Sequence, residues 1–315
     1  FMAKPAIFLA NSELSFPAKN AEGDLITIEG EEFFAVKNVD AMPPFLMSIV
    51  SDSDLWMFIS SSGGVTAGRK NADHALFPYY TDDKIHESAE TSGSKTIVRV
   101  DAEKGTLLWE PFSDKYMGAY RVSRNLYKST TGNSVIFEEI NHDLELGIRV
   151  KWMNSDHWGW VKETLLLNHS NEEKVLSMLD GLVNILPYGI LKSTQEQFST
   201  LMDAYKQSDL ASSGLGVFSM SSIPVDRAEP SEALKATTVW CSADDPGAYL
   251  LSTDQLPSFR ETGTLETEKN KRGIRGAFFV QRTISLKPGS HDSHLVVAEV
   301  DQDSSEVHNL DLALN

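Results

Sequence analysis

The chain has 315 residues, of which 41% are hydrophobic and 9% aromatic, which is typical of a folded protein with a sizeable core. Its 28 Lys and Arg residues against 45 Asp and Glu residues give a formal charge of -17, which disfavours binding to nucleic acid and to anionic lipid surfaces. Since no run approaches the roughly 18 apolar residues of a membrane span, we expect a soluble protein without a membrane partner.

The N-terminus shows no export signal. Phe1-Met2 is not followed by the charged region and the hydrophobic stretch that make up a signal peptide. We therefore expect a cytoplasmic protein, unless a signal has been cleaved off.

Residues 60–85 follow strands expected at residues 32–36, 45–50 and 56–60, but keep neither the period of a strand nor that of a helix. One interpretation is a packed surface loop. The alternative is a carbohydrate-contacting loop, because Asp and Asn bind hydroxyls, Arg donates through a rigid fork and Tyr stacks on a pyranose ring. The candidate substrate-binding residues are Arg69, Asn71, Tyr79, Tyr80, Asp82 and Asp83.

Alternating apolar and polar residues predict the strands in the middle of the chain. The clearest covers residues 144–152, where every even position is apolar and should face the core. Short turns join it to strands at residues 134–140 and 120–128, which predicts an antiparallel meander. Further strands are expected at residues 96–101, 106–110, 160–168, 175–182, 236–241, 248–252, 276–286 and 294–300.

One amphipathic helix is expected at about residues 193–208. Ser193 and Glu196 have the spacing of a capping box, which marks the start of a helix. The apolar positions that we expect to pack on the core are Phe198, Leu201, Met202 and Tyr205. Because this helix lies between strands, the predicted fold class is all-β: a large antiparallel two-sheet sandwich with one inserted helix, spanning residues 1–300.

The sequence carries no recognisable catalytic or metal-binding signature. It lacks a phosphate-binding loop, a dinucleotide fingerprint, a nucleophile elbow and a His-Glu-x-x-His motif, and its eight His residues have no regular metal-ligand spacing. The single Cys241 excludes a disulfide within the chain and lies in an apolar run, so we interpret it as a buried, inert thiol. We expect no cofactor and no metal.

Several motifs, in this order along the chain, resemble one known family. They are Phe45-Leu-Met-Ser-Ile49, Trp56-Met-Phe-Ile-Ser60, Ser60-x-Ser-Gly-Gly64, Leu76-x-Pro-Tyr79, Trp109-Glu-Pro-Phe112, Ile136-Phe-Glu-Glu139, Gly276-Ala-Phe-Phe-Val-Gln281 and Ile284-Ser-Leu-Lys-Pro-Gly289. Together they are similar to the N-terminal region of the cellobiose phosphorylase and cyclic glucan synthase family. Tyr79-Tyr80 stands where that family has one Trp, which indicates a distant branch.

The resemblance implies a galactose-mutarotase-like supersandwich, followed by a helical linker and an (α/α)6 barrel that holds the catalytic carboxyl group. Residues 301–315 would begin that linker, so no catalytic residue is carried over. The chain would then be a non-catalytic domain of a glycoside phosphorylase or hydrolase that contributes to the carbohydrate site. Its partner would be an oligo- or polysaccharide, bound through the absent catalytic domain, and a homodimer is left open.

Two other functions are compatible with the sequence. A supersandwich can itself act as a mutarotase or epimerase by shuttling a proton between a Glu and a His, for which Glu138 or Glu139 with His86 or His157 are the candidates. The chain can also be a plain carbohydrate-binding module.

Overall fold

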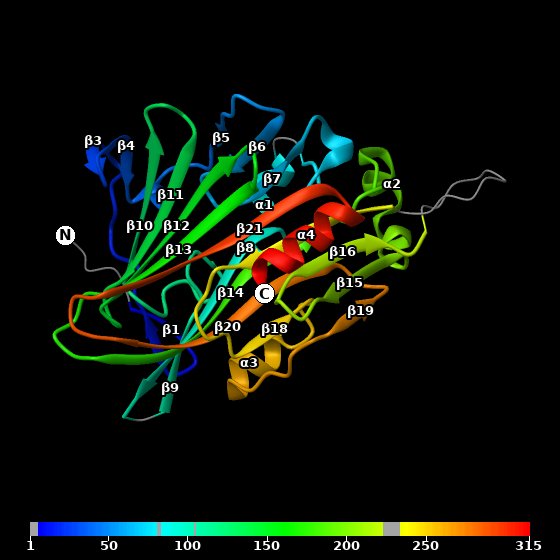
Figure 1. Ribbon diagram of the computed structural model, residues 1–315. Helices are drawn as coiled ribbons and strands as arrows, with labels where there is room; N and C mark the ends of the chain where they lie inside the picture. Colours follow the sequence, from blue (N-terminus) through cyan, green and yellow to red (C-terminus); the bar gives the residue numbers. More distant parts are fainter. Residues whose placement is uncertain (1–5, 81–82, 104, 223–233) are drawn as a thin grey trace.

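The computed structural model describes residues 6–80, 83–103, 105–222 and 234–315. In it the chain folds into two layers of antiparallel β-sheet (Figure 1). The first layer is an 11-stranded sheet. In spatial order it contains β19 (Asn270–Arg272), β15 (Lys206–Leu210), β16 (Gly216–Met220), β17 (Lys235–Cys241), β21 (His291–Asp303), β13 (Gly159–Asn168), β12 (Leu146–Ser155), β11 (Ser134–Asn141), β10 (Val122–Ser129), β4 (Glu31–Lys37) and β3 (Glu22–Ile28).

The second layer consists of a five-stranded sheet and a three-stranded sheet. The larger contains β18 (Ala248–Leu250), β20 (Gly276–Leu286), β14 (Lys174–Ile185), β8 (Gly93–Ala102) and β9 (Gly105–Trp109), and the smaller β5 (Leu46–Ile49), β6 (Leu55–Ser60) and β7 (Val65–Arg69). A separate hairpin joins β1 (Ile7–Leu9) to β2 (Ser12–Leu14). The expected all-β supersandwich of large antiparallel sheets is confirmed.

The core lies between the layers, and the strand predicted most clearly faces it. β10, β11 and β12 pair in sequence order, as expected of a meander. The five apolar residues with even numbers from 144 to 152 are at most 5% exposed. Leu144, Leu146 and Ile148 pack with residues of β8, β14 and β20. Further along the same face, Val150 and Trp152 pack with residues of the three-stranded sheet. The alternation of apolar and polar residues therefore predicted correctly which face of this strand is buried.

A fully buried ion pair connects the two layers. Lys162 on β13 and Asp180 on β14 are both 0% exposed, and Nζ lies 2.7 Å from Oδ1. Thr96 and Thr164 donate to the same carboxylate at 2.6 and 3.0 Å, and His294 Nε2 lies 2.9 Å from its Oδ2. Because every partner of Asp180 is also buried, this cluster is part of the core.

The expected helix is present as α2 (Lys192–Asp203), but three details of the prediction are wrong. It ends at Asp203 instead of at about residue 208, because residues 206–210 form β15. Leu191 occupies the N-cap position, so Ser193 and Glu196 form no capping box. Met202 is buried, whereas Phe198 and Leu201 are 52% and 53% exposed. Phe198 has non-helical backbone angles that kink the helix, so the apolar positions do not stay on one face.

Three further α-helices were not predicted: α1 (Asp83–Glu87), α3 (Leu256–Thr262) and α4 (Ser304–Leu314). α3 packs Leu256 and Phe259 on the side of the five-stranded sheet that faces away from the large sheet. α4 follows β21, where we expected the linker to begin, and is capped by Asp303 and Glu306. None of the helices in the described residues combines the length and hydrophobicity needed to cross a bilayer.

The stretch 60–85 is more ordered than its sequence suggested. Residues 65–69 form β7 and residues 72–74 a 3-10 turn, and α1 follows after the two residues outside the description. Gly64 explains part of the unusual composition, because a Cβ there would lie 1.9 Å from the backbone oxygen of Ile85. Only glycine therefore lets α1 pack this closely on the turn after β6.

Candidate functional site

A cleft of about 770 Å³ opens between the large sheet and β9. The inner faces of β10 and β11 form one wall, and β9 with the following loop forms another. Helix α1, the N-terminal segment and the turn before β5 complete it. The lining comes from residues within 15–19, 39–44, 61–62, 86–90, 108–125 and 137–139.

Aromatic side chains form part of this lining. Tyr116 is 39% and Phe16 48% exposed, so both present ring surface to a ligand. Tyr120 donates its hydroxyl hydrogen to the backbone oxygen of Leu108 at 2.9 Å, which fixes its ring. Rings of this kind stack on the apolar faces of flat or ring-shaped ligands.

Glu139 lies at the base of the cleft and is held rigidly. It stands opposite Arg124 in the β10–β11 register, and Arg124 Nε donates to its Oε2 at 2.8 Å. Trp109 Nε1 and the backbone N–H of Phe112 donate to the carboxylate at 2.7 and 2.8 Å. Arg124 Nη1 also donates to Asp114 at 2.6 Å. Protein donors thus occupy three of the roughly four lone-pair positions of the Glu139 carboxylate.

Glu110 is a second buried carboxylate of the cleft. Arg260 donates to it from Nε and Nη2 at 2.5 and 3.0 Å, and Lys95 Nζ lies 3.5 Å from its Oε2. Burial alone would raise the pKa of Glu110, but the hydrogen bond from Arg260 and the charge of Lys95 lower it below the ordinary value. Burial likewise opposes the ionised form of Glu90, but the hydrogen bond from Lys95 and its charge lower the pKa of Glu90. Both carboxyl groups are ionised at neutral pH.

His86 on α1 borders the cleft and continues into a short chain of hydroxyl groups. Its Nδ1 lies 2.7 Å from Ser60 Oγ, which lies 2.8 Å from Ser62 Oγ. Ser62 also donates to the backbone oxygen of His86 at 3.0 Å. Ser60 is 0% exposed, so it orients the His86 ring and is not accessible as a nucleophile.

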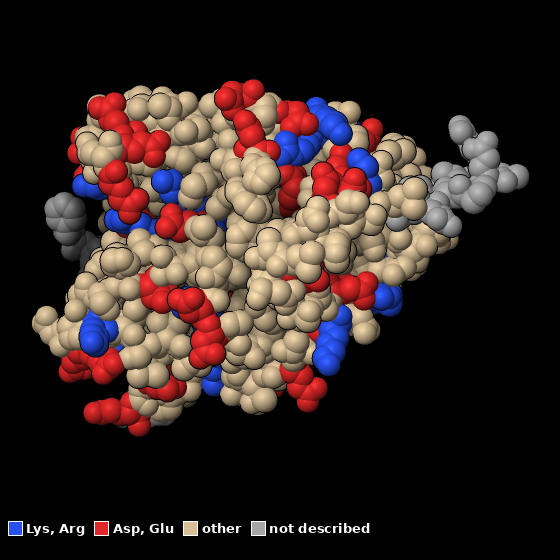
Figure 2. All heavy atoms as spheres, viewed as in Figure 1, with Lys and Arg blue, Asp and Glu red and all other residues tan. Residues whose placement is uncertain are grey.

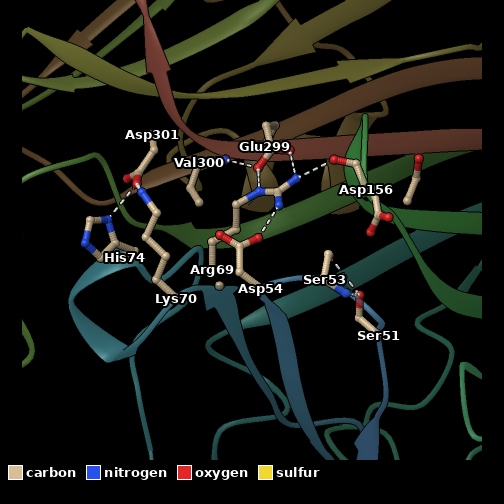
Figure 3. A network of polar contacts seen from close by, with 12 residues as sticks. Ser51, Ser53, Asp54, Arg69, Lys70, His74, Asp156, Glu299, Val300 and Asp301 are labelled. Carbon is tan, nitrogen blue, oxygen red and sulfur yellow. Dashed lines mark hydrogen bonds and ion pairs between the residues drawn. The ribbon is translucent and has the colours of Figure 1, made fainter.

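Arg69, the first of the residues predicted to contact sugar, binds other parts of the chain (Figure 3). Its Nε and Nη2 donate to both carboxylate oxygens of Glu299 at 2.8 and 2.6 Å. Nη1 donates to Asp54 at 2.5 Å and Nη2 also to the backbone oxygen of Asp156 at 2.9 Å. The hydrogen bond to Glu299 raises the pKa of Arg69, so the guanidinium stays charged and connects β7, β21 and the β12–β13 turn.

The other described residues of the predicted set lie in or near β7 and α1. Asn71 caps the 3-10 turn by accepting from the backbone N–H of Asp73. Tyr79 packs edge-on against Trp56, with a distance of 5.7 Å between the ring centroids. The hydroxyl group of Tyr80 is partly buried, which raises its pKa. Asp83 is the exposed first residue of α1, the helix that borders the cleft, and Asp82 lies outside the described residues.

Replacing Arg69 by Ala should lower the free energy of unfolding by about 2–3 kcal/mol, because the Glu299 carboxylate, whose side chain is only 11% exposed, loses its charged donor. Chemical denaturation measures this loss. The neighbouring variant Lys70→Ala is the matched control, since Lys70 is exposed and makes only a 3.2 Å ion pair with Asp301, worth at most about 1 kcal/mol. A normal stability of Arg69→Ala together with lost sugar affinity would instead support the role predicted from the sequence.

The structure separates the Glu and His candidates for proton transfer. Glu139 and His86 both line the cleft. Glu138 points to the opposite face of β11, where Tyr127, Asn125 and Arg149 donate to it. His157 lies in the β12–β13 turn and packs against Trp158.

Sequence reasoning missed Arg124, Tyr116 and Glu110 as site residues. Glu110 follows Trp109 in one of the quoted motifs, but nothing in the motif shows that both side chains reach a cleft. Arg124 could have been found from the meander, because pairing residues 120–128 with 134–140 places a basic residue opposite a Glu. Tyr116 lies in a loop without any periodic signal.

The fold and the cleft together define an all-β supersandwich protein with an aromatic and acidic cleft. Figure 2 shows more Asp and Glu than Lys and Arg on the visible face, in agreement with the charge of -17. Within the described residues, no group of three or more His, Cys, Asp or Glu side chains is arranged to hold a metal ion.

Comparison with protein-family models and with curated protein sequences finds no match. Among solved structures, the chain is similar to an aldose epimerase homologue from C. elegans, with a TM-score of 0.45 and 10% identity over 83% of this chain and 100% of that one. It is also similar to a polysaccharide lyase, with a TM-score of 0.44 and 11% identity over 86% of this chain. The chain spans 34% of the length of that lyase.

Proposed function

We propose that this chain is a carbohydrate-binding domain and that its cleft holds part of an oligo- or polysaccharide. The observation that carries the proposal is the lining of the cleft, where exposed rings lie next to fixed hydrogen-bonding groups. Its volume of about 770 Å³ lies within the usual range of ligand pockets, roughly 300–1,000 Å³. Rings that stack on a pyranose and carboxylates that accept from hydroxyl groups are the contacts a sugar requires.

We propose further that the domain does not catalyse a reaction by itself. A general acid at neutral pH needs a carboxyl group whose pKa is raised. In this cleft the pKa of Glu110 and of Glu90 is lowered, and three protein donors occupy Glu139. The domain would instead serve a larger glycoside phosphorylase or hydrolase. Of the residues predicted in the stretch 60–85, Asp83 would add a contact to the sugar, because it is exposed on α1, the helix that borders the cleft.

A second candidate function, sugar anomer interconversion, is favoured by one observation. Glu139 and His86 line the same cleft, as a proton shuttle would require. Polarimetry with freshly dissolved glucose or galactose tests it: the proposal of a non-catalytic domain predicts no acceleration by this chain. Acceleration that is lost in both Glu139→Gln and His86→Ala would establish the mutarotase function instead.

Replacing Tyr116 by Ala should weaken oligosaccharide binding at least tenfold, about 1.4 kcal/mol, because the exposed ring is removed from the cleft. Titration calorimetry with cellotetraose, maltotetraose and laminaritetraose measures the affinity. Tyr116→Phe, which keeps the ring, should bind nearly as well as the wild type.

Trp158→Ala is the matched control for this experiment, because Trp158 is also an exposed aromatic residue but does not line the cleft. An equal loss of affinity in Trp158→Ala and Tyr116→Ala would mean that the cleft is not the binding site. No binding of any of the three tetrasaccharides to the wild-type chain would contradict the proposed function.

A further inference from the structure

The charges of the cleft bear on which class of saccharide it accepts. Resting on the proposed function, we infer that the cleft selects uncharged saccharides and excludes those that carry carboxylate or sulfate groups. Each charged side chain of the lining, and the ion pair it makes, contributes to this selectivity.

Acidic groups outnumber basic groups in the lining. Six carboxylates line the cleft, against two Lys or Arg side chains, Lys19 and Arg124. The six are Asp40, Glu87, Glu90, Glu110, Asp114 and Glu139. A cleft with low-dielectric walls concentrates the field of such groups, so the potential inside it is negative.

The basic groups already have carboxylate partners within the cleft. Lys19 Nζ lies 2.6 Å from Asp40 Oδ2. Arg124 binds Glu139 and Asp114 at 2.8 and 2.6 Å. An anionic ligand that sought either cation would have to compete with these bonds, and the carboxylate it displaced would lose its partner.

Lys95, in a small recess next to the cleft, is engaged in the same way. Its Nζ lies 2.9 Å from Glu90 and 3.5 Å from Glu110. The recess shares Glu90, Phe112 and Ser113 with the cleft. Lys95, and Arg260 through its ion pair with Glu110, therefore add two cations next to the cleft, both already engaged by its carboxylates. The six carboxylates still outnumber the four Lys and Arg side chains that bind them.

Glu87 has no such partner among the described residues. It is the exposed last residue of α1 and forms no ion pair there. Its carboxylate is an acceptor for the hydroxyl groups of a neutral sugar, and it repels a uronate or a sulfate. The same groups that bind hydroxyls thus discriminate against anionic sugars.

Matched pairs of oligosaccharides test the inference on the whole chain. The probes are cellotetraose and maltotetraose, each with a counterpart whose C6 hydroxymethyl groups are oxidised to carboxylates. We expect each carboxylated tetramer to bind at least tenfold more weakly than its neutral parent at 20 mM salt. The difference should shrink at 500 mM salt, because screening weakens the repulsion.

Glu87→Lys localises the effect to the cleft. Relative to the neutral tetramers, this variant should raise the affinity for the carboxylated ones by about threefold to tenfold, because a repelling carboxylate is replaced by an attracting cation. Asp244→Lys makes the same change in net charge at an exposed residue of the β17–β18 loop that does not line the cleft, and should have little effect.

The outcomes separate the two proposals. If the neutral tetramers bind and the carboxylated ones bind equally well or more tightly, the inferred selectivity is wrong and the proposed function still stands. Equal effects of Glu87→Lys and Asp244→Lys would also overturn it, since the whole surface charge would then be responsible. Absence of binding for all four tetramers would overturn both.

Discussion

Asp180→Asn should lower the free energy of unfolding by about 3–5 kcal/mol, the cost of removing one partner of a buried ion pair. Lys162 Nζ lies 2.7 Å from Asp180 and has no access to water, so the variant leaves its charge buried without a counter-ion. An Asn side chain keeps only one acceptor oxygen, so one of the two threonine hydroxyl groups would also lose its acceptor. Urea denaturation of the variant and the wild type measures the difference.

The double variant Asp180→Leu with Lys162→Met is the control. Replacing both charges by apolar side chains removes the unpaired buried charge and should restore part of the stability. The recovery stays incomplete, because the buried side chains of Thr96, Thr164 and His294 lose the carboxylate they bind. If Asp180→Asn melts at the wild-type temperature, the ion pair does not connect the layers as the structure indicates.

The effect of Asp180 should depend on pH. Burial opposes its ionised form, but the charge of Lys162 and the hydrogen bond with His294 hold the pKa of Asp180 far below its usual range. A lowered folded-state pKa contributes stability that is fully present above the unfolded value, about 3.9, and is lost as pH falls through the folded value. The gap in stability between wild type and Asp180→Asn should therefore be constant from pH 5 to 7 and narrow below about pH 4.

Val150→Asp should abolish soluble expression. Val150 is 2% exposed and packs between the large sheet and the second layer. An unpaired carboxylate at this position costs several kcal/mol in addition to the lost apolar packing, which is a large part of the stability of a typical domain. The soluble fraction after expression and, if any protein is recovered, its melting temperature measure the effect.

Val175→Asp makes the same chemical change on β14, where Val175 is 45% exposed. Its carboxylate stays in water, so this control should lose no more than about 1 kcal/mol. Similar behaviour of the two variants would contradict the assignment of residue 150 to the buried face of β12.

The meander of β10, β11 and β12 could be predicted from the sequence because its information is local. Each strand buries one face, so a period of two appears in the sequence itself. β7 could not be predicted in this way, since its residues 65–68 are buried on both faces and show no alternation. In α2 the apolar period is present, but Phe198 and Leu201 are exposed because the helix is kinked and only Met202 meets the core.

The candidate site depends on contacts that no local pattern encodes. Arg69 has the residue type of a sugar ligand, but its role was decided by Glu299, which is 230 positions away along the chain. The ion pair of Glu110 with Arg260 spans 150 positions in the same way. The sequence by itself determined the fold class, the strand faces and the acidic charge, because these follow from composition and short-range periodicity. Only the tertiary structure decided which carboxylates are paired, which rings are exposed and where the cleft lies, because the partners come from segments that meet only when the two layers pack.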